Sequence, residues 1–183
     1  FSLKQKEFNL NSFTIEKGSI LELKKKIEKV GIPLKELNVK IYRGVLTGFN
    51  EAFIIDEDKR DEILKNCKDE DERERTEKII KPILRGRDIF RYGYRWAGLW
   101  LIKIEAGWTN RNRKDNEPEN YFKENFSSVY SHLKEIGDKV EKESRKERGK
   151  GLYNRDDQGD YWWELRQCAY YDEFEKEKIV WQE

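Results

Sequence analysis

The spacing of apolar residues predicts a mixture of helices and short strands. Every third or fourth position between residues 18 and 31 is apolar, which predicts an amphipathic helix. Ser19 is a suitable N-cap for this helix and Gly31 a C-terminal stop. The apolar stripe consists of Ile20, Leu23, Ile27 and Val30.

Strands are predicted where β-branched and aromatic residues cluster. Residues 39–46 and 52–56 are expected to form two short strands joined by a hairpin or tight loop around Gly48 and Asn50. "GLWLIKIEAG", residues 98–107, reads as a buried strand, and "KIVWQE", residues 178–183, as a terminal one.

Further helices are predicted at 56–67, at 71–84 with a stop at Gly86, and along 120–138, beyond which the apolar stripe is lost. "YWWELRQCAYY", residues 161–171, fits a short helix or turn, and "EKESRKERGKGLYNRDD", residues 141–157, a mobile insertion. The predicted fold class is therefore α+β: a small twisted, mainly antiparallel β-sheet or partial barrel flanked by helices.

Composition is compatible with one folded domain. The 183 residues are 41% charged with a mean hydropathy of −1.03, but 13% are aromatic, including six Trp, which can offset the entropy of ordering. Cys67 and Cys168 each stand alone, so neither a zinc ribbon nor a disulfide framework is indicated and a cytoplasmic location is expected. No membrane span or signal peptide is recognisable.

Candidate catalytic residues are few. The single histidine, His132, lies within a predicted amphipathic helix and is expected at the surface or core edge. Glu57 and Lys59 have the acid-x-Lys spacing of metal-dependent nucleases, which leaves such a nuclease as an alternative function. Acids at the start of a helix, here Asp56, Glu57 and Asp58, equally complement its N-terminus.

Charge is distributed unevenly although the net charge is only +1. Residues 56–78 contain eleven acids and seven bases, whereas residues 79–103 contain six bases and one acid. From Arg85 to Trp96 arginines occupy odd positions and aromatics mostly even ones, so an extended chain would bury the aromatics and present the arginines. These arginines could bind phosphate or guanine edges, or pair with the upstream acids.

Three ordered blocks carry a resemblance to a known family. "KIYRGVLTGFNEAFIID", "IIKPILRGRDIFRYGYRWAGLWLI" and "YWWELRQCAYYDEFEKEKIVWQE" resemble the TaqI-like C-terminal specificity domain of adenine-specific DNA methyltransferases, including bacterial type II enzymes that both cut and methylate. The resemblance covers most of residues 39–183. It implies a target recognition domain that clamps double-stranded DNA against an upstream methyltransferase domain and selects the sequence to be methylated.

This resemblance also implies how the chain fits into a larger protein. Residues 1–38 would be a helical connection from the catalytic domain, and residues 39–183 the recognition domain. The fragment itself would have no catalytic activity and no cofactor, in keeping with prolines that are never adjacent and so cannot form the Asn-Pro-Pro-aromatic loop. The parent would be a methyltransferase fused to a restriction endonuclease, using S-adenosylmethionine and magnesium.

The resemblance assigns candidate DNA-binding residues block by block. They are Arg43, Gly44, Thr47, Gly48 and Asn50; then Lys81, Arg85, Gly86, Arg87 and Arg91; and finally Arg166. Asp88, Tyr92, Trp163, Glu164, Trp181 and Gln182 also match the blocks, but Trp100, Trp162, Trp163 and Trp181 are expected mainly to pack in the core or between domains. A Trp-rich protein-interaction module is the remaining alternative.

Overall fold

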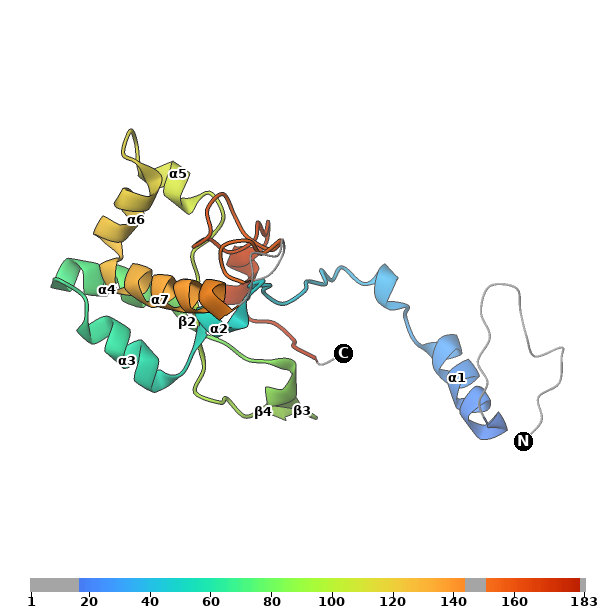
Figure 1. The fold of residues 1–183 in the computed structure, drawn as a ribbon. Helices are drawn as coiled ribbons and strands as arrows, with labels where there is room; N and C mark the ends of the chain where they lie inside the picture. Colours follow the sequence, from blue (N-terminus) through green and yellow to red (C-terminus); the bar gives the residue numbers. More distant parts are fainter. Residues whose placement is uncertain (1–16, 144–150, 182–183) are drawn as a thin grey trace. The chain divides into compact units, whose positions relative to one another are not determined.

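A computed structural model describes residues 17–143 and 151–181, and the chain divides into two compact units, Phe1–Arg43 and Gly44–Glu183 (Figure 1). The α+β class is confirmed, because the described residues contain helices together with a three-stranded and a two-stranded antiparallel sheet. No closed barrel occurs in these residues. The functional division into a connection over 1–38 and a recognition domain over 39–183 stays a prediction.

In the described part of the first unit, residues 17–43, there is one exposed amphipathic helix. Helix α1 spans Gly18–Val30, as predicted, and ends where the Gly31 N–H donates to Ile27 O at 2.7 Å. Its N-cap is Lys17 instead of Ser19, so that detail of the prediction is wrong. The whole apolar stripe is solvent-exposed, and a short 3-10 turn, η2 (Leu34–Glu36), follows.

A three-stranded sheet lies at the centre of the second unit. Its order is β1 (Ile54–Ile55), β5 (Trp100–Ile102), β2 (Ile80–Pro82), and both pairs are antiparallel. Pro82 lies in an edge strand, where its missing N–H does not interrupt a ladder. The predicted buried strand within residues 98–107 is confirmed as β5.

The hairpin predicted over residues 39–56 is wrong, although the strand expected within residues 52–56 is present as β1. Residues 39–46 have no regular structure, and residues 50–53 form the short helix α2 (Asn50–Phe53) that leads into β1. The reason is tertiary, since β1 pairs with β5 far along the chain and leaves residues 39–46 without a strand partner.

Helices α3 (Glu57–Lys65) and α4 (Glu70–Ile79) confirm two predicted helices. As expected for an acidic helix start, the Asp56 carboxylate caps α3 by accepting from Lys59 N at 2.8 Å. Helix α4 ends well before Gly86 because Ile80 and the two residues after it join the sheet.

The long helix expected from residue 120 is divided in two. Helix α6 (Pro118–Asn125) ends at Phe126, and α7 (Ser127–Glu143) begins directly afterwards, while α5 (Trp108–Asn112) precedes them. The buried Glu72 carboxylate holds the start of α7, accepting from Ser128 N and from the Ser127 hydroxyl at 2.9 Å each. Burial opposes ionisation of Glu72, yet hydrogen bonds from Ser128, Lys68 and Ser127 outweigh it and lower the pKa of its carboxyl.

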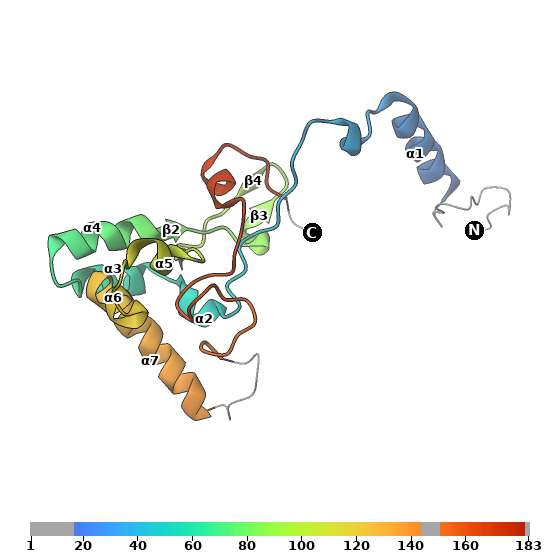
Figure 2. The same cartoon turned by 90° about the horizontal axis from the view of Figure 1, so that it is seen from above.

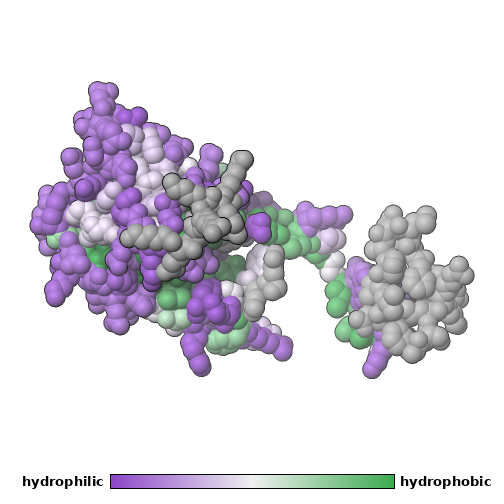
Figure 3. Space-filling model, viewed as in Figure 1, coloured by the Kyte–Doolittle hydropathy of each residue, from purple (hydrophilic) through white to green (hydrophobic). Residues whose placement is uncertain are grey.

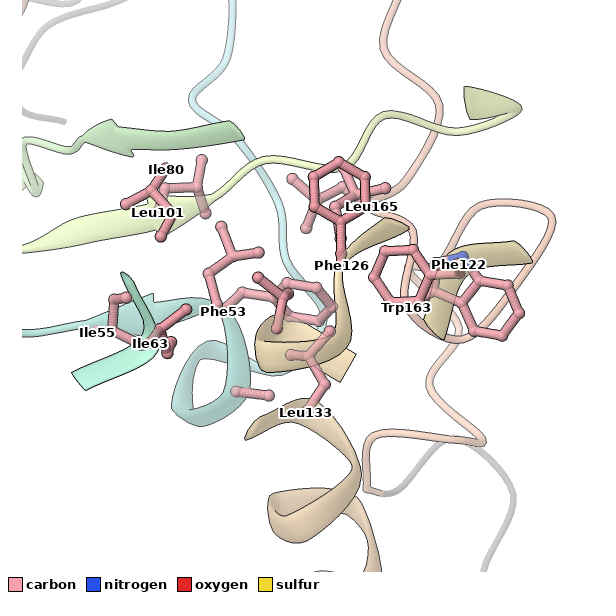
Figure 4. Close-up of a cluster of buried hydrophobic side chains, with 14 of the residues drawn as sticks. Phe53, Ile55, Ile63, Ile80, Leu101, Phe122, Phe126, Leu133, Trp163 and Leu165 are labelled. Carbon is pink, nitrogen blue, oxygen red and sulfur yellow. The ribbon is translucent and has the colours of Figure 1, made fainter. Parts of the chain in front are cut away.

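The core joins the sheet to α2, α7 and the segment that follows α7 (Figure 4). The rings of Phe122, Trp163 and Tyr161 form a stack, with centroid separations of 5.1 and 4.8 Å and interplanar angles of 2° and 4°. Trp163 is buried as expected, and Trp100 and Trp162 are half-buried against the core. Trp181 is exposed and is not part of this core, so for Trp181 only packing between domains stays a prediction.

The second half of the predicted insertion belongs to this core. Residues 144–150 lie outside the described residues, but Leu152 and Arg155 are completely or almost completely buried. The prediction of a mobile insertion is therefore wrong for residues 151–157. A turn over residues 161–164 and a β-bridge between Gln158 and Leu165 confirm the prediction of a turn there.

The terminal strand predicted at 178–183 is also wrong. Residues 178–181 are exposed and have no regular structure, and Gln182 and Glu183 lie outside the described residues. The 3-10 turn η4 (Tyr171–Glu175) is the last regular element described. No strand edge of the central sheet pairs with residues 178–181, which explains why β propensity alone gave the wrong result.

The buried side chain of Arg155 forms hydrogen bonds to segments of the second unit that are far apart in the sequence. The Arg155 side chain is 2% exposed, and its guanidinium also lies over the Phe53 ring, 4.7 Å from the centroid. Burial lowers its pKa to about 10. The guanidinium donates to five backbone carbonyls: those of Thr47 (3.0 Å), Leu152 (2.7 Å), Asp157 (3.2 Å), Trp162 (2.5 Å) and Glu164 (2.6 Å).

We expect Arg155→Leu to reduce the free energy of unfolding by about 2–5 kcal/mol, because the substitution leaves several buried carbonyls without a donor. Urea unfolding followed by tryptophan fluorescence measures the change. Arg73→Leu is the matched control: Arg73 is exposed and, in the part of the chain that the structure describes, its ion pair is with Glu77 at 3.5 Å, so a change below about 1 kcal/mol is expected. Equal losses in both variants would contradict a structural role for Arg155.

Candidate nucleic-acid interface

The basic aromatic stretch forms a small hairpin at one edge of the second unit. Strands β3 (Ile89–Phe90) and β4 (Gly93–Tyr94) pair antiparallel, and Arg91 and Tyr92 form the two-residue turn. The hairpin lies away from α6 in both ribbon views (Figures 1 and 2). Tyr92 has a φ of 67°, an uncommon conformation for a bulky residue, and is 93% exposed.

An ion pair fixes the base of this hairpin. The 3-10 turn η3 (Gly86–Asp88) is closed by Asp88, whose carboxylate accepts from Arg85 N at 2.9 Å. The Arg85 side chain binds the same carboxylate through two nitrogens, at 3.0 and 2.8 Å. Asp88 O also accepts from Arg95 N at 2.8 Å, which connects the turn to the strand that returns. Arg85 therefore has a structural role that is visible in this hairpin.

The pKa of Asp88 reflects these contacts. The side-chain hydrogen bonds from Arg85, together with its backbone N–H, lower the pKa of the carboxyl from 3.8 to about 2. Asp88 is consequently ionised throughout the physiological pH range. Its negative charge is matched locally by the Arg85 guanidinium.

The hairpin exposes its aromatic side chains, which overturns the prediction that they are buried. The exposed fractions are 58% for Phe90, 93% for Tyr92, 63% for Tyr94 and 38% for Trp96. Each strand of the hairpin is only two residues long, and among the described residues the hairpin pairs with no further strand. Figure 3 shows hydrophilic and apolar groups side by side at this edge.

The remaining hairpin arginines are available to a ligand. Arg87, Arg91 and Arg95 are exposed, and within the described residues none of them forms an ion pair with the acids of α3 or α4. Arg91 instead lies over the Tyr92 ring at 5.0 Å from its centroid. The alternative in which these arginines form a salt-bridge network with the upstream acids is thus not realised.

Arg87 and Arg95 also line a hollow of about 400 Å³ beside the hairpin. Its other lining residues are Asp88, Phe90, Trp96 and Ala97. Arg95 and Trp96 were not among the predicted site residues, although they continue the same alternating pattern. The pattern itself was the signal that could have identified them.

Candidates of the first block surround the buried arginine. Thr47 is buried, its carbonyl accepts from Arg155, and its hydroxyl donates to Asn50 Oδ1 at 2.6 Å. Gly48 has a φ of 68°, and a Cβ there would lie 2.9 Å from both Arg155 Cδ and Asp157. The contacts of Thr47 and Gly48 within the fold account for these two residues without a contact to DNA. Gly44 is exposed with nothing near its Cα, and Arg43 is an exposed residue of the first unit.

The other candidates are dispersed. Lys81 is half-buried in the edge strand β2, and Gly86 is exposed at the start of η3. Arg166 is exposed and pairs with Asp157 at 3.0 Å. The structure brings Gly86, Arg87 and Arg91 together with Arg85 in one hairpin, and Thr47, Gly48 and Asn50 around Arg155. Among the described residues, no hydrogen bond or ion pair links the hairpin group to the group around Arg155.

Two block residues are structural. Trp163 Nε1 donates to Thr109 Oγ1 at 2.9 Å, within the aromatic stack. The buried Glu164 carboxylate accepts from the N–H groups of Gly107, Thr109 and Asp160, all at 2.9 Å, and so holds the start of α5. Arg155, which forms more buried hydrogen bonds than either, was missed because it lies in a polar, glycine-containing segment.

Glu57 and Lys59, the residues proposed for a metal-dependent nuclease, lie in the first turn of helix α3. Lys59 pairs with Glu62 at 2.5 Å, and Glu57 occupies the acidic first turn. Among residues 17–143 and 151–181, no three His, Cys, Asp or Glu side chains are grouped so that they could hold a metal. His132 lies at the core edge, as predicted, with Nε2 3.1 Å from Ala52 O. Cys67 and Cys168 are both free thiols.

Comparisons with known proteins identify no relative of this chain. No family model, curated protein or solved structure matches the chain. In the described part of the chain, none of the helices combines the length and the apolar character required to span a bilayer.

The Arg85–Asp88 ion pair predicts an acid-sensitive hairpin. Because the pKa of Asp88 is lower in the folded chain, the pair stabilises the hairpin above about pH 4, and this contribution is lost as pH falls through about 2. Carbon-13 NMR of the Asp88 carboxyl should titrate with a midpoint near 2. Asp88→Asn should abolish the titration and accelerate hydrogen exchange at the Arg95 amide. A midpoint at the ordinary value near 3.8 would contradict the ion pair.

Proposed function

We propose that the chain is a sequence-specific recognition module for double-stranded DNA. The observation that carries the proposal is the hairpin, which exposes Arg87, Arg91 and Arg95, none of which forms an ion pair within residues 17–143 and 151–181. A two-stranded β-ribbon has dimensions that the major groove admits, and guanidinium groups bind phosphate or the O6 and N7 edge of guanine. With a net charge of only +1, binding depends on this local basic surface.

The sequence resemblance supports a more specific form of the proposal. In that form the chain is the target recognition domain of an adenine-specific DNA methyltransferase fused to a type II restriction endonuclease. The methyltransferase and endonuclease domains of the parent use S-adenosylmethionine and magnesium in the cytoplasm, and this module holds DNA against them without contributing catalytic residues. A separate recognition surface has a physical reason, since a catalytic pocket contacts only the base extruded into it.

The hairpin's base and its exposed arginines have different roles in this proposal. Arg85 is bound on two nitrogens by Asp88 and keeps the turn folded, while Arg87, Arg91 and Arg95 contact DNA. The two alternatives have weaker support. Trp163 is 2% exposed and cannot dock a partner, and Glu57 lies in the first turn of a helix.

The combined variant Arg87→Ala, Arg91→Ala and Arg95→Ala should weaken binding to duplex DNA. If each arginine contacts a phosphate, the slope of log K against log salt should fall by about 3. Fluorescence anisotropy with a labelled duplex at several salt concentrations measures both quantities. Circular dichroism of the variant should be unchanged, because all three side chains are exposed.

A second triple variant is the matched control. Lys65→Ala, Arg73→Ala and Lys139→Ala removes the same charge from exposed positions on α3, α4 and α7. We expect it to retain the wild-type salt slope. An equal loss in both triple variants would mean that binding follows net charge, and the assignment of the hairpin would be wrong.

A further inference from the structure

The hollow beside the hairpin combines flat apolar surfaces with positive charge. Phe90 and Trp96 contribute aromatic rings, and Arg87 and Arg95 contribute guanidinium groups. The volume of about 400 Å³ is within the range of small-molecule sites and is large enough for one nucleobase. The hollow therefore has the groups that bind a planar, anionic ligand.

Both aromatic rings contact neighbouring residues, Phe90 within the hairpin and Trp96 beyond it. The Phe90 ring lies against Gly93, where a Cβ would come within 2.9 Å of it, yet Phe90 remains 58% exposed. Trp96 Nε1 donates to Leu99 O at 3.1 Å, and its ring meets Trp100 edge-on at 5.3 Å. The Arg60 guanidinium lies over the other ring of this pair, 4.3 Å from the Trp100 centroid. Rings fixed in this way can stack on a ligand without losing much side-chain entropy.

The charge of the hollow favours an anion. Asp88 lines it, but both carboxylate oxygens accept from Arg85, whose guanidinium offsets the negative charge of the acid. Arg87 and Arg95 form no ion pair within the described residues. Two guanidinium groups beside two exposed rings are a suitable combination for a base and its phosphate.

We propose that this hollow binds one unpaired nucleobase, stacked against Phe90 and Trp96, with a neighbouring phosphate on Arg87 and Arg95. The inference rests on the proposed function and extends it from paired to locally unpaired DNA. In an intact duplex both faces of a base are covered by its neighbours, so only a base that has left the stack offers a face to these rings. The site would therefore select DNA in which one base is extruded.

The test compares three labelled duplexes that differ at one position, using the whole 183-residue chain. One duplex is fully paired, one has a single-adenine bulge, and one has an abasic nucleotide as the bulge. We expect about fivefold to hundredfold tighter binding to the adenine bulge than to the other two, from the usual strength of base stacking on aromatic side chains. The abasic duplex separates base binding from a preference for bent DNA.

Two variants locate the effect. Phe90→Ala should remove the preference for the adenine bulge while leaving binding to the paired duplex unchanged. Tyr94→Ala is the matched control, since Tyr94 is 63% exposed on the same hairpin but does not line the hollow, and should keep the preference.

Each other outcome overturns a defined part of the inference. Equal affinity for all three duplexes, or equal affinity for the two bulges, would exclude the base site and leave duplex recognition intact. Retained preference in Phe90→Ala, or equal loss in Tyr94→Ala, would exclude this hollow as its location. Absence of binding to any duplex would overturn the proposed function as well.

Discussion

The second unit depends on one buried guanidinium. Arg155 donates to five backbone carbonyls and lies over Phe53, so the segment before α2 and the segment after α7 are held by the same side chain. Backbone carbonyls in a core require donors, and arginine carries enough N–H groups to satisfy several of them at once. The glycine at position 48 fits this contact, because a Cβ there would collide with Arg155 and the backbone has a φ of 68°.

Two buried carboxylates repeat this arrangement with opposite charge. Glu72 accepts from the start of α7 and Glu164 from the start of α5, positions where helices leave N–H groups unpaired. A chain that is 41% charged thus uses some of its charges inside the fold, as partners of the backbone, alongside a stack of aromatic rings. The low mean hydropathy therefore does not prevent a packed core.

The hairpin uses charge differently. One arginine, Arg85, is bound by Asp88 and keeps the turn closed, whereas Arg87, Arg91 and Arg95 remain exposed beside uncovered aromatic rings. Exposing so many large rings on two short strands brings no benefit to the fold, and a bound ligand would bury them. This contrast is the physical basis for proposing DNA as the partner and an extruded base as a preferred target.

Local periodicity, capping and composition are enough to predict the α+β class, helices α1, α3 and α4, strand β5 and the basic aromatic stretch. Contacts between distant parts of the chain set the pairing of β1 with β5, the break at Phe126, the burial of Arg155 and the exposure of Phe90 and Tyr94. Each of these depends on a partner distant in the chain, or on the absence of a covering layer. Neither is recorded in the local pattern of residues, so a polar segment became core and an apparently buried aromatic face became surface.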